Sequence, residues 1–335
     1  MSYKGEQLAE CLTAFGLPCR FKELKTAPRL TTYYFDFLNV AKVTPSKQKT
    51  ALQRLSLYAK TDFYYTKSNI SHFAISHAEN NNPVVHLSTV ELPTQDTKQF
   101  VVGITEQNEQ LNVSLDAMIH SLIAGTTGSG KSVFIKDLLY TLCARNSPQN
   151  LNFAIIDKKR TLNFFNRIPH SLAVGNTDNE AVYIVKRFQE EMYRRYSEMQ
   201  RMGIEKNNGQ FPKWVLVIDE LADLMLTDLK PEIESCLVSL CQLGRAAGIH
   251  CILCTQTPRV AVVSGLIQAN TPTKIIFKTA SIKESVLCLG HKGAEELLGN
   301  GDCLVKLPDR VNEIRVQTPF ASDEEFKQAV GGKKQ

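Results

Sequence analysis

The sequence predicts an α/β fold in which a parallel β-sheet is covered by helices on both faces. From Ile119 onward, short apolar segments alternate with helical segments, and glycine-containing turns stand between several of them. Hydrophobic residues make up 43% of the 335 residues, which is enough to bury a core and excludes global disorder. Apolar strands that alternate with helices are typical of a parallel sheet, because each crossover helix packs on one of its faces.

The strands of this sheet are expected where the apolar segments are short and uninterrupted. The clearest helices are expected at 133–142 and 181–202, where apolar residues recur at helical spacing. The expected strands are 120–124, 152–156, 214–218, 250–254 and 273–277.

A smaller α/β module is expected before residue 100. Residues 30–38 are rich in aromatic and branched side chains and predict a strand. Thr44, Pro45 and Ser46 predict a helix start, since proline fits the first turn of a helix. Short strands are expected at 63–65, 73–76 and 84–87. We therefore divide the chain into a module at 1–100, a main domain at 101–322 and a polar tail at 323–335.

Composition and charge narrow the class of protein. The longest apolar runs, such as 214–218, are far shorter than the roughly 18–20 residues that cross a bilayer, and the N-terminus has no apolar signal core. A cytoplasmic protein is therefore expected. The net charge is +5, and residues 1–60 hold ten Lys/Arg against four Asp/Glu. This basic segment predicts either phosphate contacts or a solvated surface, and charge alone does not decide between them.

The nine cysteines predict reduced thiols, because no secretion signal accompanies them. Cys251 and Cys254 have CxxC spacing inside an apolar segment that predicts a buried strand. A zinc site would need a second pair at suitable spacing, and none follows. We therefore interpret the two as packed free thiols.

A phosphate-binding motif follows the predicted strand at 120–124 and opens the predicted helix at 133–142. Glycines let the backbone approach phosphate oxygens, and the helix N-terminus adds partial positive charge. The lysine neutralises the β- and γ-phosphates and the serine hydroxyl binds Mg²⁺, so ATP and Mg²⁺ are the expected cofactors. The motif fits GxxxxGK[ST] with Gly125, Thr126, Thr127, Gly128, Ser129, Gly130, Lys131 and Ser132.

A second half of this site is predicted 87 residues after Ser132, where the strand at 214–218 ends in Asp219 and Glu220. We expect Asp219 to hold the Mg²⁺ shell together with Ser132. Glu220 is the expected base that orients and deprotonates the attacking water, which favours hydrolysis over mere nucleotide binding. Gln256 follows the next predicted strand, 250–254, and is placed to sense the γ-phosphate. Lys131, Glu220 and Gln256 are thus predicted catalytic residues.

Several further motifs resemble the motor domain of the FtsK/SpoIIIE family in order and spacing. They include DELADLM (219–225), GRAAGIH (244–250), TQTP (255–258), GLIQANTPTKIIF (265–277) and GAEELLGNGDCL (293–304). The similarity is strong over 110–320 and weak over 20–110. It implies a RecA-like P-loop ATPase core preceded by the family's smaller module.

The resemblance also implies partners and one further catalytic residue. It implies a homo-hexameric ring that pumps double-stranded DNA through its channel, with ATP between neighbouring subunits. Arg245, in GRAAGIH, matches the family's arginine finger, which would complete the site of a neighbouring subunit.

The sequence departs from the family where DNA contacts are expected. The segment after Gln256 reads Thr-Pro-Arg-Val, so the positive residue moves to Arg259. Ile282 and Val286 stand at positions that are often basic, and we expect Lys278 and Lys283 to substitute for them. Arg259, Lys278 and Lys283 are therefore the candidate DNA-binding residues. We expect neither the family's membrane anchor nor its winged-helix reader of DNA sequence in this chain.

The leading functional interpretation is ATP-driven movement of double-stranded DNA for a mobile element, plasmid or phage. A genome-packaging ATPase is the first alternative and uses the same chemistry. An FtsK-like ATPase for protein export is a second, and a slow nucleotide-gated DNA-binding scaffold is a third. Stimulation of hydrolysis by duplex DNA separates these classes.

Overall fold

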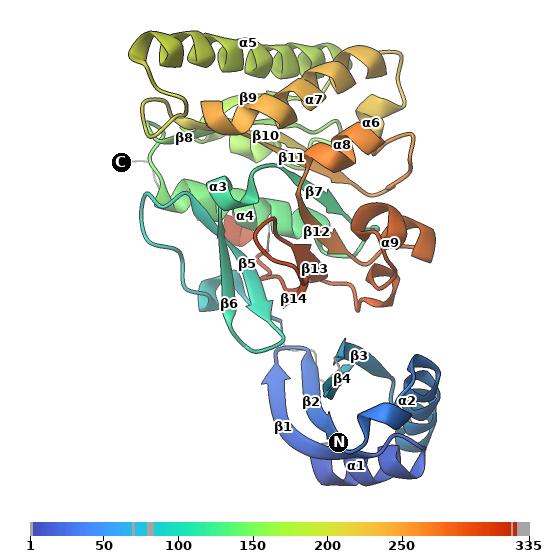
Figure 1. The fold of residues 1–335 in the computed structure, drawn as a ribbon. Coiled ribbons are helices and arrows are strands. Elements are labelled where there is room, and N and C mark those ends of the chain that lie inside the picture. Colours follow the sequence, from blue (N-terminus) through green and yellow to red (C-terminus); the bar gives the residue numbers. More distant parts are fainter. Residues whose placement is uncertain (1–2, 69–70, 79–83, 323, 327–335) are drawn as a thin grey trace. The chain divides into compact units, whose positions relative to one another are not determined.

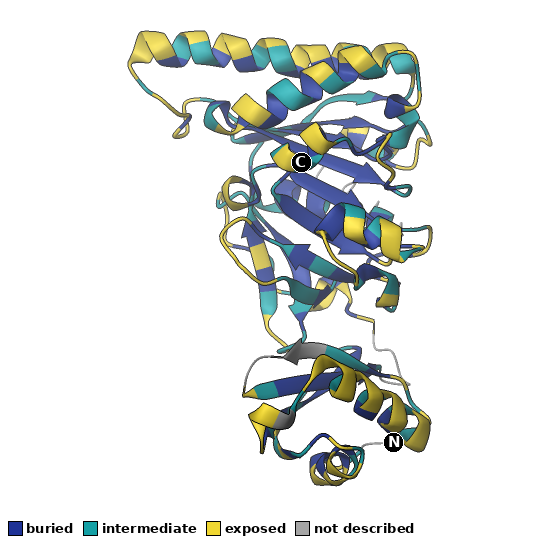
Figure 2. Ribbon diagram, turned by 45° about the vertical axis from the view of Figure 1, so that its right-hand side comes forward, coloured by how far each residue is buried: buried dark blue, intermediate teal, exposed yellow. Residues whose placement is uncertain are grey.

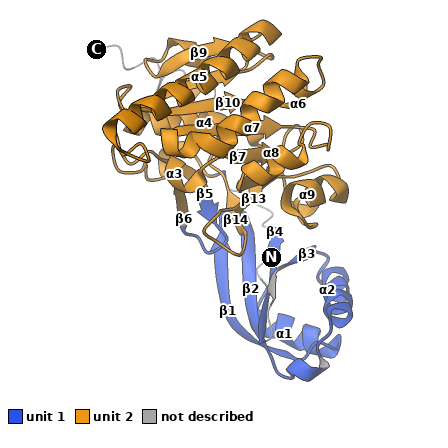
Figure 3. Ribbon diagram, turned by 45° about the horizontal axis from the view of Figure 1, so that its top comes forward, with its two compact units in different colours: residues 1–84, 104–109 blue, residues 85–103, 110–335 orange. Residues whose placement is uncertain are grey.

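The computed structural model describes residues 3–68, 71–78, 84–322 and 324–326. The chain divides into two compact units, which Figure 3 shows in blue and orange. The first holds residues 1–84 and 104–109, and the second holds 85–103 and 110–335. Most of the predicted polar tail, residue 323 and residues 327–335, lies outside the described residues.

The first unit is an antiparallel sheet with two helices. Its strand order is β1-β2-β4-β3, with β1 at Cys19–Ala27, β2 at Leu30–Phe37, β3 at Phe63–Ser68 and β4 at His72–Ala78. The helices are α1 (Gly5–Ala14) and α2 (Pro45–Ala59), and a 3₁₀ turn, η1, covers Val40–Lys42.

The predicted strand at 30–38 and the predicted start of α2 are both confirmed in this unit. The Thr44 side chain accepts a hydrogen bond from the Lys47 amide, and Pro45 occupies the first turn. Tyr33 and Phe35 of β2 are buried in the core that α1 and α2 cover. The predicted strand at 84–87 is wrong, because the chain there forms one isolated bridge at His86 and then a 3₁₀ turn, η2 (Leu87–Thr89).

The second unit is built on one large sheet, in the order β6-β5-β14-β13-β12-β7-β11-β10-β8-β9. The six strands from β12 to β9 are parallel, and five of them match the predicted strands, whereas β9 was not predicted. β13 pairs with β12, and β14 with β13, in antiparallel fashion. The bounds are β5 (Gln99–Thr105), β6 (Gln110–Ser114), β7 (Ser121–Ala124), β8 (Leu151–Ile156), β9 (Ser171–Gly175), β10 (Lys213–Ile218), β11 (Ile249–Thr255), β12 (Thr273–Phe277), β13 (Asp302–Lys306) and β14 (Ile314–Gln317).

Helices cover both faces of this sheet, as the sequence predicts. Successive side chains of a strand point to opposite faces, so each central strand contributes to two cores. One core contains α4 (Lys131–Arg145) and the other contains α5 (Asp178–Met202) and α7 (Lys230–Ala247). Figure 1 shows α5 and α7 together over one side of the sheet, and Figure 2 shows its central strands in the dark blue of buried residues.

Shorter helices connect these elements. They are α3 (Leu115–Met118), η3 (Asn163–Arg167), α6 (Ala222–Met225), α8 (Gly265–Asn270), α9 (Ile282–Leu289) and η4 (Ala294–Glu296). Among the described residues, no helix has the length and apolar character needed to cross a bilayer.

Candidate nucleotide site

The predicted phosphate-binding motif forms the turn between β7 and α4. Gly130 has a φ of 105°, a left-handed conformation that favours glycine, and a Cβ there would lie 2.4 Å from the Gly301 nitrogen. The amides of Gly128, Gly130, Lys131 and Ser132 donate no hydrogen bond within the described part of the chain. These free N–H groups stand at the start of a 15-residue helix and form a site suited to an anion.

Two distant segments hold this turn in shape. The Gly301 amide donates a hydrogen bond of 2.7 Å to the Ser129 carbonyl, and the Asn300 amide donates one of 3.3 Å to Gly128. On the other side, the Thr126 amide donates to the Lys278 carbonyl at 2.9 Å. The role of Gly301 was not inferred from sequence, although it lies within one of the motifs that resemble the FtsK/SpoIIIE family.

Lys131 and Asp219 form an ion pair, and both side chains are almost fully buried. The ammonium of Lys131 donates to the Asp219 carbonyl at 2.8 Å and lies 3.5 Å from Asp219 Oδ1. That carboxylate oxygen accepts no hydrogen bond among the described residues. A buried carboxylate oxygen without a hydrogen-bond partner is the kind of oxygen ligand that Mg²⁺ requires, and the hydroxyl of Ser132, in the first turn of α4, is of the same kind.

Glu220 is held by the strand next to its own. The Thr255 hydroxyl donates to its Oε1 at 2.7 Å, and the Gln256 amide donates to its Oε2 at 2.9 Å. The Ala222 amide adds a weaker bond of 3.2 Å to Oε1. The pKa of the nearby Asp223 is raised by burial and by the Glu220 carboxylate. Glu220 is thus a carboxylate fixed in direction at the carboxyl edge of β10.

Gln256 connects this carboxylate to the phosphate-binding turn. Its amide donates to Glu220, while its side-chain Oε1 accepts a hydrogen bond of 3.1 Å from the Thr127 hydroxyl. The structure therefore brings Lys131, Asp219, Glu220 and Gln256 together at one edge of the sheet, as expected when parallel strands end side by side. The contribution of Thr255 was not inferred, because nothing local to Thr255 marks its partner.

Arg245 lies at the opposite edge of the sheet. It is exposed and stands in the last turn of α7, four residues before β11 begins. The 7 residues of β11 span about 20 Å from that end to Thr255. Arg245 therefore does not belong to the constellation around Lys131 of its own chain.

The end of α7 that carries Arg245 is held in place by a buried arginine of α5. The fully buried Arg195 of α5 donates from Nη1 to the carbonyls of Ala247 and Pro212, each at 2.9 Å, and its guanidinium stacks on Trp214. The positive charge of Arg245 also acts on the nearby His120. Burial is the largest cause that lowers the pKa of His120 to about 3, followed by the neighbouring His250 and then Arg245. Arg245 is thus an exposed cation on a fixed helix end.

The three candidate DNA-binding residues are all exposed and follow the carboxyl ends of β11 and β12. Arg259 begins a turn, in which its carbonyl accepts hydrogen bonds from the amides of Val262 and Val263. Lys283 lies in the first turn of α9. Lys278 stands directly against the phosphate-binding turn through its carbonyl.

The CxxC pair does not form a joint site. Cys251 and Cys254 are three residues apart on β11, so they point to opposite faces and belong to different cores. All nine cysteines are free, and burial raises the pKa of Cys254 above its usual range. The pair therefore does not act as one CxxC motif, and neither cysteine is in a disulfide bond.

Comparison with known proteins finds one family model and many relatives. The model of the FtsK/SpoIIIE family matches residues 92–209 and 205–260. The DNA translocase FtsK of Campylobacter jejuni (strain 81-176) is 42% identical over 229 residues, which cover 64% of this chain and 24% of that protein. The DNA translocase FtsK of Sporosarcina ureae is 32% identical over 352 residues, covering 97% of this chain and 45% of that protein. The chain thus spans less than half the length of these relatives.

Solved structures support the fold. The conjugation coupling protein TcpA of pCW3, in its monomer form with ATPγS, superposes with a TM-score of 0.65 at 20% identity, covering 99% of this chain and all of that one. The cytoplasmic domain of the type VII secretion ATPase EccC of Thermomonospora curvata gives 0.61 at 24% identity, covering 72% of this chain and 31% of that one. These likenesses show a P-loop ATPase fold.

Proposed function

Because the chain belongs to the FtsK/SpoIIIE family, we propose that it is an ATP-driven motor that moves double-stranded DNA. The observation that carries the proposal is the site at the carboxyl edge of the sheet. There, unpaired amides, a buried lysine and a fixed carboxylate on neighbouring strands meet around one turn. Such a site supports phosphate binding and water activation at the same place.

Each residue has a role that its contacts support. The free amides of the turn and Lys131 would bind the phosphates, which replace Asp219 as the partner of the ammonium. Ser132 and Asp219 would hold Mg²⁺, which when bound neutralises charge on the phosphates. Glu220 would accept the proton of the attacking water, and the bonds from Thr255 and Gln256 keep its carboxylate in one direction.

Gln256 would report nucleotide occupancy to Glu220. Its side chain bonds Thr127 of the phosphate-binding turn, and its amide bonds the Glu220 carboxylate. A γ-phosphate that engages Thr127 would compete for the first of these bonds. The second would then transmit the change to the base, so that hydrolysis follows correct nucleotide binding.

Arg245 would complete the site of a neighbouring copy. Its place at the far edge of the sheet prevents it from reaching the phosphates held by its own chain, whereas a ring would present it to the next subunit. An arginine at this position would stabilise charge that develops during phosphoryl transfer. Its exposure and its anchored helix end support this role.

Double-stranded DNA would contact Arg259, Lys278 and Lys283. The three cations are exposed and follow the strands next to the site, so a change at the phosphate-binding turn could reach them through short segments. Lys278 is the most directly coupled, because its carbonyl accepts from the Thr126 amide. That this motor moves the DNA of a mobile element, plasmid or phage remains a prediction from sequence.

Measurement of ATP hydrolysis with different polymers tests this proposal. Linear duplex DNA should raise the turnover rate of the full chain well above its basal value, and single-stranded DNA of equal length should raise it less. Stimulation by unfolded polypeptide but not by duplex DNA would favour protein export instead. No stimulation by any polymer would favour the slow scaffold.

A further inference from the structure

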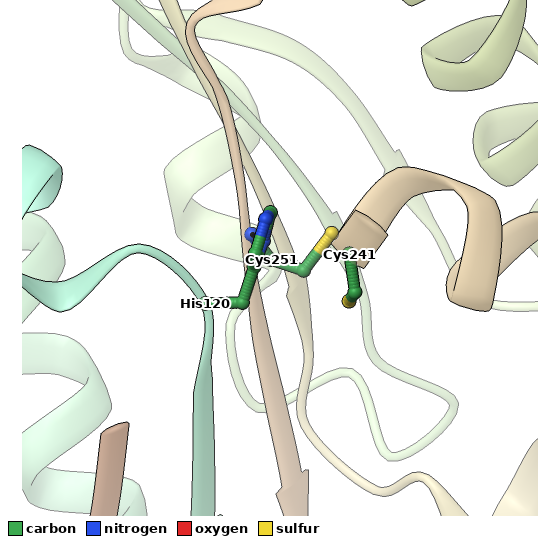
Figure 4. A group of neighbouring side chains, drawn as sticks. All are labelled: His120, Cys241 and Cys251. Carbon is green, nitrogen blue, oxygen red and sulfur yellow. Dashed lines mark hydrogen bonds between the residues drawn. The ribbon is translucent and has the colours of Figure 1, made fainter. Parts of the chain in front are cut away.

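A cluster of metal-ligating side chains lies in the second unit, at the edge of the sheet opposite the nucleotide site. His120 immediately precedes β7, Cys241 lies on α7 and Cys251 lies on β11. Their ligand atoms all lie within 4.8 Å of one another, and all three residues are buried. Figure 4 shows the three side chains near one another on these three elements.

We propose that His120, Cys241 and Cys251 bind one thiophilic metal ion, Zn²⁺ or Cu(I). Thiolate sulfur and imidazole nitrogen are the ligands that both ions prefer. Two thiolates and a neutral imidazole would give a zinc complex with no net charge and a copper complex with a single negative charge. A low net charge matters here, because a buried net charge is strongly disfavoured.

An unpartnered nitrogen points to the same use of the site. His120 Nδ1 accepts a hydrogen bond of 3.0 Å from the Cys251 amide, whereas its Nε2 is buried without a partner among the described residues. A buried polar atom without a partner is uncommon and calls for a ligand or a function. A bound ion would give this imidazole a use that the surrounding protein atoms do not.

Binding requires a small rearrangement of hydrogen bonds. The neutral ring carries one proton, which must lie on the nitrogen that does not bind the ion. Either choice gives up the bond from the Cys251 amide. The loss of one such bond is small beside the binding free energy of a metal held by two thiolates.

The two candidate ions differ in the number of ligands that they need. Cys254 lies on the opposite face of β11 and cannot supply a fourth ligand. Cu(I) is satisfied by three ligands, whereas Zn²⁺ would also need a water. Because the ligands come from three elements, the ion would enter as the domain folds and would then join α7 to β11 and to the start of β7. Its binding does not depend on ATP hydrolysis, so the two proposals can fail separately.

Elemental analysis of the full chain tests the site. The protein is produced in medium supplemented with zinc or with copper, and the folded protein is treated with a chelator that removes ions from exposed sites. One ion per chain should remain in one of the two preparations, and that preparation identifies the metal. Absence of a retained ion from both wild-type preparations would overturn the proposal without any variant.

Matched variants locate the ion. Cys241→Ser and Cys251→Ser should each lose it, whereas Cys254→Ser, on the same strand but the other face, should retain it. Circular dichroism confirms that each variant is folded. Substitution with Co²⁺ should give a thiolate charge-transfer band in the wild type and in Cys254→Ser only. An ion that persists in folded Cys241→Ser or Cys251→Ser would also overturn the proposal.

Discussion

The Thr255 hydroxyl, at the end of β11, donates a hydrogen bond of 2.7 Å to Oε1 of Glu220, which follows the neighbouring strand β10. This bond fixes the direction of the carboxylate that we propose as the base. Thr255→Val should lower the rate of ATP hydrolysis about tenfold, as expected when one hydrogen bond to a charged group is lost. Thr255→Ser keeps the hydroxyl and should retain most of the rate. Equal rates in the valine and serine variants would remove Thr255 from the site.

Glu220→Gln should bind ATP with unchanged affinity and lose turnover. The amide keeps the size of the side chain and can still accept from Thr255, but it cannot accept a proton from water. Filter binding measures the first property and phosphate release measures the second. Normal turnover in this variant would assign the base to another residue, with the neighbouring Asp223 as the next candidate.

Arg245→Ala should leave nucleotide binding intact and abolish hydrolysis, because the arginine is proposed to act on a neighbouring subunit. Mixing this variant with Glu220→Gln should restore part of the activity, since some interfaces then combine both unchanged groups. Arg187→Ala removes an exposed arginine from α5 and should behave as wild type. No recovery on mixing, under conditions where subunits demonstrably exchange, would contradict the trans role.

Replacing Arg259, Lys278 and Lys283 with alanine should weaken binding to duplex DNA and reduce its stimulation of hydrolysis. Each lost phosphate contact should make the salt dependence of binding shallower by about 0.9 units of log K per unit of log salt. The exposed residues Arg187, Arg201 and Lys206 give a control triple variant of equal charge. If the first triple variant matches this control, the contact with DNA moves elsewhere, and the basic residues 1–60 become the next candidates.

The central sheet and the nucleotide site could be predicted because their signals are local. Buried parallel strands are continuous apolar runs, and the turn before α4 carries its chemistry in eight consecutive residues. The antiparallel strands β13 and β14 were missed, since Asp302–Lys306 and Ile314–Gln317 are short and partly polar. β1 is mostly exposed and polar, so its pairing with β2 defines it more than its own composition does.

Contacts between distant segments could not be predicted from one sequence. The bond from Thr255 to Glu220 joins residues 35 positions apart, and the cluster of His120 with Cys251 joins residues 131 apart. CxxC spacing drew attention to Cys254, yet strand geometry sends that side chain to the other face. In the structure, Cys241 rather than Cys254 lies near Cys251 and His120, and its position there depends on how α7 packs on the sheet.

Asp137 predicts a pH dependence of stability. It is fully buried on α4, neither carboxylate oxygen has a hydrogen-bond partner among the described residues, and burial raises its pKa from 3.8 to about 9. The folded state therefore binds this proton more tightly than the unfolded state. The resulting stabilisation is complete below about pH 4 and is lost as the pH rises towards about 9, by up to about 1.4 kcal/mol per pH unit.

Asp137→Asn removes this titration, so its melting temperature relative to wild type should be higher at about pH 8 than at about pH 6. Differential scanning calorimetry at the two pH values measures the difference. An identical difference at both would mean that Asp137 keeps an ordinary pKa.

Translocation itself is tested most directly by displacement of a third strand from duplex DNA. A triplex-forming oligonucleotide is placed at one end of a linear duplex, and its release is followed after ATP is added. The wild-type chain should release the oligonucleotide at a rate that depends on ATP, while Lys131→Ala, which lacks the phosphate-binding cation, should not. A wild-type protein that hydrolyses ATP in the presence of duplex DNA yet never releases the third strand would contradict the proposed motor.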